Sequence, residues 1–213
     1  MGAVKPYYSR GGIDIYVGDA REVLPTLPNV DVVLTDPPYG NDTVYDGYED
    51  TQEALESLIC TTMPLLREKA TRVLLTPGVG NLWRYPQPDW TLAWFTPAGA
   101  GSGPWGFCCW QPIIAYGKDP YLQESLGRRP DAIVWTETSE KNGHPVPKPI
   151  AFWRWLVQRA VVRSTDVICD PFCGSGTTLR AAKDLGFKAI SIEQSERYAE
   201  IAANRLQQEV FAL

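Results

Sequence analysis

The sequence predicts an α/β protein built on a mainly parallel sheet that helices cover on both faces. Short apolar runs alternate with stretches of helical periodicity, a pattern typical of parallel strands joined by crossover helices. Two apolar runs end in an acid followed by a turn, as strands do at the ligand-binding edge of such a sheet. The 213 residues, 44% of them hydrophobic, suit one globular domain with a sizeable core.

The individual elements follow from the period of the apolar residues. The expected strands are 13–17, 30–35, 72–76, 90–95, 107–116, 132–136, 167–170 and 188–193. The expected helices are 20–27, 52–68, 149–162, 177–185 and 196–208. Pro64 is expected to interrupt or kink the second helix, because it lacks an N–H donor, whereas Pro149 suits a first helical turn.

A glycine-rich run follows the expected strand 167–170. It reads Asp170-Pro-Phe-Cys-Gly-Ser-Gly-Thr-Thr178, and its glycines allow the backbone to approach a ligand closely. Free N–H groups at the start of the next helix favour an anion. The run is not G-x-G-x-x-G and lacks the Lys of a phosphate loop, so a methionine carboxylate suits it better than a dinucleotide or a nucleoside triphosphate. Glu193, at the tip of the next strand, is placed to bind ribose hydroxyls.

A second motif, Thr35-Asp-Pro-Pro-Tyr-Gly40, follows the expected strand 30–35. The amine of adenine or cytosine is a poor nucleophile, because its lone pair is delocalised into the ring. A carboxylate and a backbone carbonyl that accept its two hydrogens expose that lone pair, and an aromatic face can hold an extruded base. Asp36, the Pro37 carbonyl and Tyr39 fit these three roles, while the prolines Pro37 and Pro38 stiffen the backbone. The reaction needs no metal.

In this order the two motifs resemble those of the permuted β-class of amino-methylating DNA methyltransferases. The resemblance covers most of the chain and implies a Rossmann-like, mostly parallel seven-stranded sheet, circularly permuted, with a small target-recognition insertion at about residues 96–142. The implied reaction is methyl transfer from S-adenosylmethionine to a flipped-out base in double-stranded DNA, leaving S-adenosylhomocysteine. Asp36 at the first motif position is commoner in adenine-N6 than in cytosine-N4 members, which favours adenine.

The resemblance also implies roles for further residues. The run His144-Pro-Val-Pro-Lys-Pro149 is similar to an element that encloses the methionine end of the cofactor, with Lys148 closing the pocket. Asp19 is similar to the family's adenine-contacting acid and also suits a helix N-cap. The expected cofactor-binding residues are Asp19, Lys148, Asp170, Phe172, Cys173, Gly174, Ser175, Gly176, Thr177, Thr178 and Glu193. The run 110–118 is similar to the family's strand before the recognition region.

Charge and aromatic residues give candidate DNA contacts. The chain carries a net charge of −5, but residues 118–163 hold 8 basic and 5 acidic residues, for +3. Arg128 and Arg129 are therefore candidate DNA contacts, with solvated surface charge as the alternative. Trp105 and Trp110 are candidate linings of the target-base pocket. The short recognition region predicts a short target or a homodimer.

Composition limits the remaining possibilities. The five cysteines form no C-x-x-C pair and there is one histidine, so we expect no metal site. The sequence has no long apolar span, and we expect a cytoplasmic protein without a membrane partner. The acidic loop 41–50 is either a lid over the base or a solvated loop, and 96–104 is either a DNA-ordered loop or a linker. The alternative functions are cytosine-N4 methylation, methylation of RNA or a protein amide, and an inactive protein that binds DNA or the cofactor.

Overall fold

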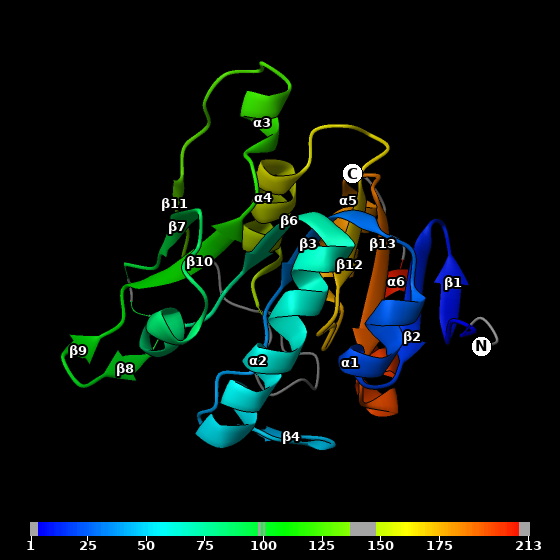
Figure 1. Ribbon diagram of the computed structural model, residues 1–213, viewed down its shortest axis with the longest axis horizontal. Helices are drawn as coiled ribbons and strands as arrows, with labels where there is room; N and C mark the ends of the chain where they lie inside the picture. The colour runs from blue at the N-terminus through cyan, green and yellow to red at the C-terminus, as the bar shows by residue number, and fades with distance from the viewer. Residues whose placement is uncertain (1–3, 98, 100, 137–147, 209–213) are drawn as a thin grey trace.

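The computed structural model describes residues 4–97, 99, 101–136 and 148–208, and these residues are built around one large mixed sheet (Figure 1). Its order is β1-β2-β13-β12-β3-β6-β10-β7-β11. Seven of these strands run in one direction, while β1 and β10 oppose them. The strands are β1 Tyr8–Arg10, β2 Ile13–Val17, β3 Val30–Thr35, β6 Ala70–Leu75, β7 Trp90–Phe95, β10 Trp110–Tyr116, β11 Ala132–Val134, β12 Val167–Asp170 and β13 Lys188–Glu193.

The expected α/β class and mostly parallel sheet are confirmed, but the expected number of seven strands is wrong. Within the described residues the sheet has nine strands, and the outermost, β1 and β11, have three residues each. Both are edge strands whose side chains are half-buried or exposed. The strand expected at 132–136 contains β11, whereas β1 was not expected, because it carries no buried apolar run.

The permuted connectivity is visible in the order of the central strands. The late strands β12 and β13 lie between the early strands β3 and β2 and pair with them in parallel. As a result, the motif after β3 and the motif after β12 follow neighbouring strands at the same edge, although they are more than 130 residues apart in the sequence. We call this the carboxyl edge, because the parallel strands end there.

Helices cover both faces of the sheet, and the alternation of strand side chains fixes which face each apolar residue joins. Val32 and Leu34 pack with α4, α5 and α6, whereas Val33 packs with α1 and α2. The helices are α1 Ala20–Val23, α2 Gln52–Lys69, α3 Pro120–Gln123, α4 Ile150–Ala160, α5 Thr177–Asp184 and α6 Glu196–Gln207, with 3-10 turns η1 Leu24–Thr26 and η2 Val79–Arg84. The core thus has two apolar layers separated by the sheet.

Two expectations about helices are corrected. The helix expected over 20–27 is a short α-helix followed by the 3-10 turn η1, which carries Pro25 near its start. The expected interruption at Pro64 is wrong, because α2 runs unbroken from Gln52 to Lys69. Burial of Leu58, Met63 and Leu66 on one side of α2 outweighs the single lost hydrogen bond at Pro64.

Two small hairpins extend from the carboxyl edge (Figure 1). The first joins β4 Val44–Tyr45 to β5 Tyr48–Glu49, within the acidic loop. The second joins β8 Ser102–Gly103 to β9 Gly106–Phe107, between β7 and β10. Because β10 runs against the parallel strands, the segment that follows it, including α3, lies at the opposite, amino edge.

Candidate functional site

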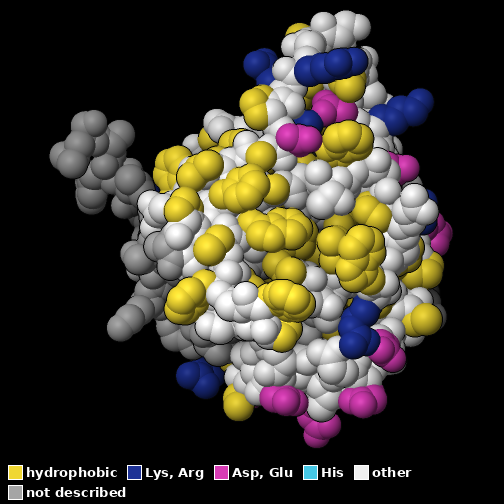
Figure 2. Space-filling model, turned by 90° about the vertical axis from the view of Figure 1, so that its left-hand side faces the viewer, with side chains coloured by type: hydrophobic (Ala, Val, Ile, Leu, Met, Phe, Trp, Pro, Cys, Tyr) yellow, Lys and Arg dark blue, Asp and Glu magenta, His cyan; other side chains and the backbone are white. Residues whose placement is uncertain are grey.

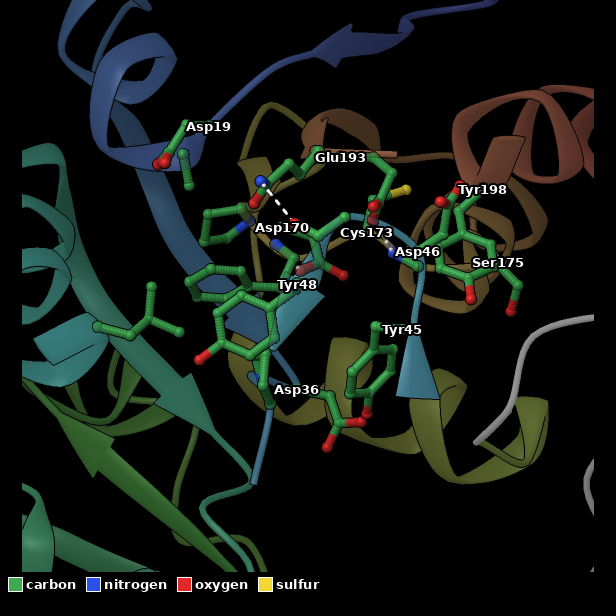
Figure 3. Close-up of a pocket in the computed structure, with 18 of the residues that line it drawn as sticks. Asp19, Asp36, Tyr45, Asp46, Tyr48, Asp170, Cys173, Ser175, Glu193 and Tyr198 are labelled. Atoms are coloured by element: carbon green, nitrogen blue, oxygen red, sulfur yellow. Dashed lines mark hydrogen bonds between the residues drawn. The ribbon is translucent and has the colours of Figure 1, made fainter. Parts of the chain in front are cut away.

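A cavity of about 410 Å³ opens at the carboxyl edge and receives residues from both sequence motifs (Figure 3). Its size is within the range of pockets that hold a small organic ligand. Most of the predicted cofactor and catalytic residues line it. They are Asp19, Asp36, Pro38, Lys148, Asp170, Phe172, Cys173, Gly174, Ser175, Thr177, Thr178 and Glu193.

Three predicted residues lie beside the cavity lining. Pro37 is buried, and Tyr39 lies against Asp36. Gly176 has a φ of +75°, and an added Cβ would lie 2.8 Å from the Cβ of Ala202 in α6. Glycine at this position therefore lets the turn pack against a helix.

Asp36 is held by side chains from three separate segments of the chain. The Tyr39 hydroxyl donates to Oδ1 over 2.6 Å, and the hydroxyl of Thr76, which follows β6, donates to the same oxygen. The Lys148 ammonium lies 2.9 Å from Oδ2. The carboxylate is thus fixed by three groups, of which the fold brings two, Thr76 and Lys148, from distant parts of the chain.

Lys148 also contacts Tyr39 directly. Its Nζ donates to the Tyr39 hydroxyl over 3.1 Å and lies 4.7 Å from the centre of the ring. Burial alone would lower the pKa of Lys148, but the Asp36 charge and Tyr39 outweigh it, so the pKa of Lys148 is raised. Burial and the Asp36 charge raise the pKa of Tyr39 to about 12. At neutral pH the cluster therefore contains an ammonium and a neutral phenol.

The segment after β6 contacts the first motif through Thr76 and Asn81. The sequence did not identify these two residues as part of the site. The Asn81 side chain is buried and donates to the Tyr39 carbonyl over 2.7 Å. Thr76 and Asn81 are neutral residues, so neither charge nor spacing drew attention to them. The available signal was their position directly after a buried parallel strand, at the edge where ligand-contacting groups gather.

Asp170 is almost fully buried, with 2% of its surface exposed. Its Oδ1 accepts from the Thr35 hydroxyl over 2.7 Å and from the Phe172 N–H over 3.1 Å. Burial raises the pKa of Asp170 to about 6. Asp170 thus joins the ends of β12 and β3, which is a structural role in addition to its place in the cavity lining.

The glycine turn is bound to the neighbouring strand end. The Gly174 N–H donates to Glu193 Oε2 over 2.7 Å, and the Ser195 N–H donates to Oε1 over 2.9 Å. The Gly176 N–H donates to the Cys173 carbonyl. The N–H groups of both glycines are therefore engaged within the protein, and they hold the turn against the end of β13. Burial raises the pKa of Glu193 to about 7.

Asp19 combines the two roles considered for it. Its carboxylate accepts from the Arg21 N–H over 2.8 Å, as the N-cap of α1, and also lines the cavity. Hydrogen bonds from the Arg21 side chain lower the pKa of Asp19. Asp19 is therefore ionised at neutral pH on the cavity wall opposite the glycine turn, as Figure 3 indicates.

The acidic loop 41–50 forms a wall of the cavity. The sequence alone did not decide whether this loop contributes to a site or is only exposed to solvent. Tyr45, Asp46 and Tyr48 of the β4–β5 hairpin line the cavity (Figure 3). The Ser195 hydroxyl donates to Asp46 Oδ2 over 2.7 Å, and Gln194 donates to the Gly47 carbonyl over 3.0 Å. The hairpin therefore connects the first motif to the end of β13.

The Tyr48 hydroxyl is a buried polar atom without a hydrogen-bond partner among the residues that the structure describes. An unpaired buried hydroxyl costs free energy, so a ligand with a matching polar group would stabilise it. Acids at Asp19 and Glu193, apolar contacts from Phe172 and this hydroxyl fit a cofactor with both a nucleoside and an amino-acid part. Ribose hydroxyls can donate to such acids.

The predicted DNA contacts lie outside this cavity and at two different edges. Trp105, at the β8–β9 turn, and the half-buried Trp110, at the start of β10, lie at the carboxyl edge. Arg128 and Arg129 follow α3 at the amino edge, where Arg129 lies 4.7 Å from the Tyr121 ring centre. The structure therefore does not bring these arginines to the edge that carries the cavity.

Exposed hydrophobic side chains gather on the side of the molecule formed by β7, β11 and the β8–β9 hairpin (Figure 2). Trp105 is fully exposed, and Phe107 is 83% exposed. Trp83, in η2 at the carboxyl edge, is 89% exposed and was not identified from the sequence. Trp83 is close to the first motif, because η2 also contains Asn81, which donates to the Tyr39 carbonyl.

The remaining expectations concern the element around His144, metal binding and membrane spans. His144 and residues 145–147 of its element lie outside the described residues. In the described part of the chain, no group of three or more His, Cys, Asp or Glu side chains is arranged to hold a metal ion. None of the described helices is long and apolar enough to span a membrane.

Comparisons of the sequence with known proteins point to one family of enzymes. A family model for N6/N4 enzymes, described as DNA methylase, matches residues 75–204, which is more than half of the chain. The type II methyltransferase M.HinfI of Haemophilus influenzae is 37% identical over 251 residues, covering 91% of this chain and 68% of its own length.

Two solved structures share the fold. The cytosine-N4-specific PvuII DNA methyltransferase has a TM-score of 0.73 at 17% identity, covering 98% of this chain and 91% of that one. The M1.HpyAVI complex with SAM has a TM-score of 0.68 at 20% identity, covering 92% and 100%. At these identities the likeness shows the architecture, and the nine-stranded sheet is a variant of it.

Proposed function

The chain belongs to the N6/N4 DNA methylase family, and from this premise we propose that it is a site-specific methyltransferase for the exocyclic N6 amine of adenine in double-stranded DNA. The observation that carries the proposal is the position of Asp36, held by Tyr39, Thr76 and Lys148 on the wall of a cavity that also receives the glycine turn. One cavity can therefore hold a methyl donor beside an amine acceptor.

The cofactor is S-adenosylmethionine, which supplies a methyl group on a sulfonium and leaves as S-adenosylhomocysteine. Glu193 and Asp19 accept hydrogen bonds from the nucleoside part of the cofactor, and the Phe172 ring packs against the adenine of the cofactor. The glycine turn and Lys148 border the amino-acid end. Cys173, Ser175, Thr177 and Thr178 shape the wall between these contacts.

The residues of the first motif prepare the amine. Asp36 and the Pro37 carbonyl accept its two hydrogens, which exposes the nitrogen lone pair to the methyl group. The N–C bond then forms as the C–S bond breaks, and the positive charge passes from sulfur to nitrogen. The Asp36 carboxylate accepts the proton that the nitrogen loses, on its way to water. The Tyr39 ring holds the flipped base by stacking.

The target-recognition region is the segment 96–142 within a single methyltransferase domain. Its β8–β9 hairpin, with Trp105, reaches the DNA beside the cavity, and Trp110 supports it. Arg128 and Arg129, at the other edge, would reach DNA through the second subunit of a homodimer or through a bent duplex. The protein acts on DNA in the cytoplasm of a bacterial, archaeal or phage-infected cell, where the type II relatives favour a role in restriction and modification.

Cytosine-N4 methylation is the second candidate. The PvuII enzyme, which is specific for cytosine N4, has the same architecture at a TM-score of 0.73. Both bases present an exocyclic amine next to a ring nitrogen, so the same carboxylate and aromatic face can serve either. Asp36 at the first motif position favours adenine.

The test uses tritiated S-adenosylmethionine and unmethylated DNA of mixed sequence, with the labelled nucleosides identified by mass spectrometry. We expect N6-methyladenine; N4-methylcytosine would select the second candidate, and label in RNA or protein alone would contradict both. The variants Asp36→Ala and Asp36→Asn should lose transfer by at least about a hundredfold, since they remove the acceptor that acts in the transition state. Both should still bind S-adenosylhomocysteine in a calorimeter, and retained transfer would contradict the mechanism.

A further inference from the structure

Lys148 makes the same two kinds of contact that the proposed function assigns to the target base. Its ammonium N–H groups face Asp36 Oδ2 over 2.9 Å, as the exocyclic amine should. The same nitrogen lies 3.1 Å from the Tyr39 hydroxyl and 4.7 Å from the centre of its ring, so it also contacts the residue assigned to hold the base. The side chains of Lys148 and Asp36 are only 15% and 22% exposed, so the ion pair is well shielded from solvent.

The amine of the base and the Lys148 ammonium seek the same carboxylate. Asp36 Oδ1 already accepts from Tyr39 and Thr76, which leaves Oδ2 for the amine of the base. Lys148 lies 2.9 Å from this oxygen, so methyl transfer requires it to yield Oδ2 to the amine.

We infer that Lys148 is a positioning residue that stands in for the target amine: it holds Asp36 and Tyr39 in the geometry used for methyl transfer and yields Oδ2 of Asp36 when the base enters. The inference rests on the proposed function. It differs from the expectation that Lys148 only closes the cofactor pocket, because the recorded contacts of Nζ are with Asp36 and Tyr39.

The arrangement makes the exchange feasible. The Tyr39 hydroxyl donates to Asp36 and accepts from Lys148, so it remains as an acceptor 3.1 Å from Nζ while Oδ2 is released. The ammonium also supplies the partner of Oδ2, because Tyr39 and Thr76 both donate to Oδ1, and an unpaired shielded oxygen would cost free energy. Asp36 is thereby presented in a single orientation before the base arrives.

Steady-state kinetics test the role. Lys148→Met should lower kcat by about tenfold to a hundredfold, because misplaced catalytic groups lose rate at this scale, without raising the KM for DNA. Lys148→Arg keeps the charge and should recover part of kcat. The control is Lys188→Met, which removes an exposed lysine at the start of β13, at the amino edge and outside the recognition region, and should leave kcat unchanged. An unchanged kcat in Lys148→Met, or a fall explained by weaker S-adenosylhomocysteine binding in a calorimeter, would overturn the inference.

A second measurement does not depend on activity. Thermal unfolding of wild type, Asp36→Asn, Lys148→Met and the double variant forms a cycle that isolates the interaction between the two residues. We expect Lys148→Met to lower Tm in the wild-type background and to have a smaller effect in the Asp36→Asn background. Equal effects in both backgrounds would overturn the inference. If the wild type fails to methylate DNA, the proposed function fails, whereas this cycle still decides whether Lys148 holds Asp36.

Discussion

Two hairpins at the carboxyl edge are equal in length but are fastened in different ways. The β4–β5 hairpin is tied at both ends. At its base, buried Asp50 accepts from the Gly40 N–H over 2.6 Å and from two further N–H groups of the loop. At its tip, Ser195 and Gln194 donate to Asp46 and to the Gly47 carbonyl. Its two tyrosines are half-buried and face the cavity.

The β8–β9 hairpin is tied mainly to its own strands. The Cys108 N–H donates to the Gly101 carbonyl, and the Thr96 N–H donates to the Cys109 carbonyl. Its aromatic residues point outward, with Trp105 fully exposed and Phe107 83% exposed. In Figure 1 this hairpin projects from the sheet, away from β4.

The difference suggests a division of work between the hairpins. A fastened hairpin with inward-facing rings suits a small ligand that is enclosed on all sides. A projecting hairpin with outward-facing rings suits a long partner that is contacted from outside, and exposed aromatic residues of this kind mark interaction sites. We therefore expect mutations in the first to affect the cofactor and mutations in the second to affect DNA.

The largest effect that separates the hairpins should come from Trp105→Ala. We expect it to weaken DNA binding by about tenfold, because an aromatic contact with a base contributes about 1–3 kcal/mol. Binding can be measured by fluorescence anisotropy of a labelled duplex at fixed salt, since affinity for DNA depends on salt. Affinity for S-adenosylhomocysteine should not change.

The matched control is Trp90→Ala. Trp90 is also exposed but lies at the start of β7, at the amino edge. An equal loss of DNA affinity in both variants would show that the β8–β9 hairpin has no special role in binding.

A smaller effect, on the affinity for the cofactor product and not on the affinity for DNA, is expected from Asp46→Ala. Loss of the Ser195 hydrogen bond frees the tip of β4–β5, and affinity for S-adenosylhomocysteine should fall by about fivefold, which corresponds to about 1 kcal/mol for one hydrogen bond. Asp46→Asn keeps an acceptor oxygen and should lose less. Calorimetry measures both, and a change in DNA affinity alone would contradict the division between the hairpins.

The two sides of the site were not equally predictable from the sequence. The cofactor side depends on residues close together in the chain, since the turn from Asp170 to Thr178 and the tip of the next strand are local patterns. Their placement in one cavity follows from the parallel order of the strands. Even here, the engagement of the Gly174 N–H by Glu193 depends on a contact between two strand ends and could not be read from either motif.

The other side depends on contacts between distant segments. Lys148 pairs with Asp36 across 112 residues, and Thr76 and Asn81 belong to a third segment. The location of Arg128 and Arg129 could not be predicted for a related reason: charge along the sequence does not reveal that β10 runs against its neighbours and carries the following segment to the opposite edge. The direction of a strand is set by its tertiary pairing, which local periodicity does not encode.

The smallest expected effect is a pH dependence confined to the cofactor side. Burial raises the pKa of Glu193 from its ordinary value of 4.5 to about 7, so this carboxyl ionises as the pH rises through about 7. An ionised carboxylate is the stronger acceptor for ribose hydroxyls. Affinity for S-adenosylhomocysteine should therefore increase between pH 6 and pH 8, by about fivefold or less.

Stability should change in the opposite direction. Because the folded protein holds this proton more tightly than the unfolded chain, the contribution of Glu193 to stability is greatest at low pH and is lost as the pH rises from about 4.5 to about 7. Glu193→Gln removes the titration and should flatten both curves, apart from a contribution of Asp170, whose pKa is about 6. DNA binding through Trp105 should lack this pH step. If the affinity of Glu193→Gln for S-adenosylhomocysteine still increases with pH as much as that of the wild type, Glu193 is not the group that links cofactor binding to pH.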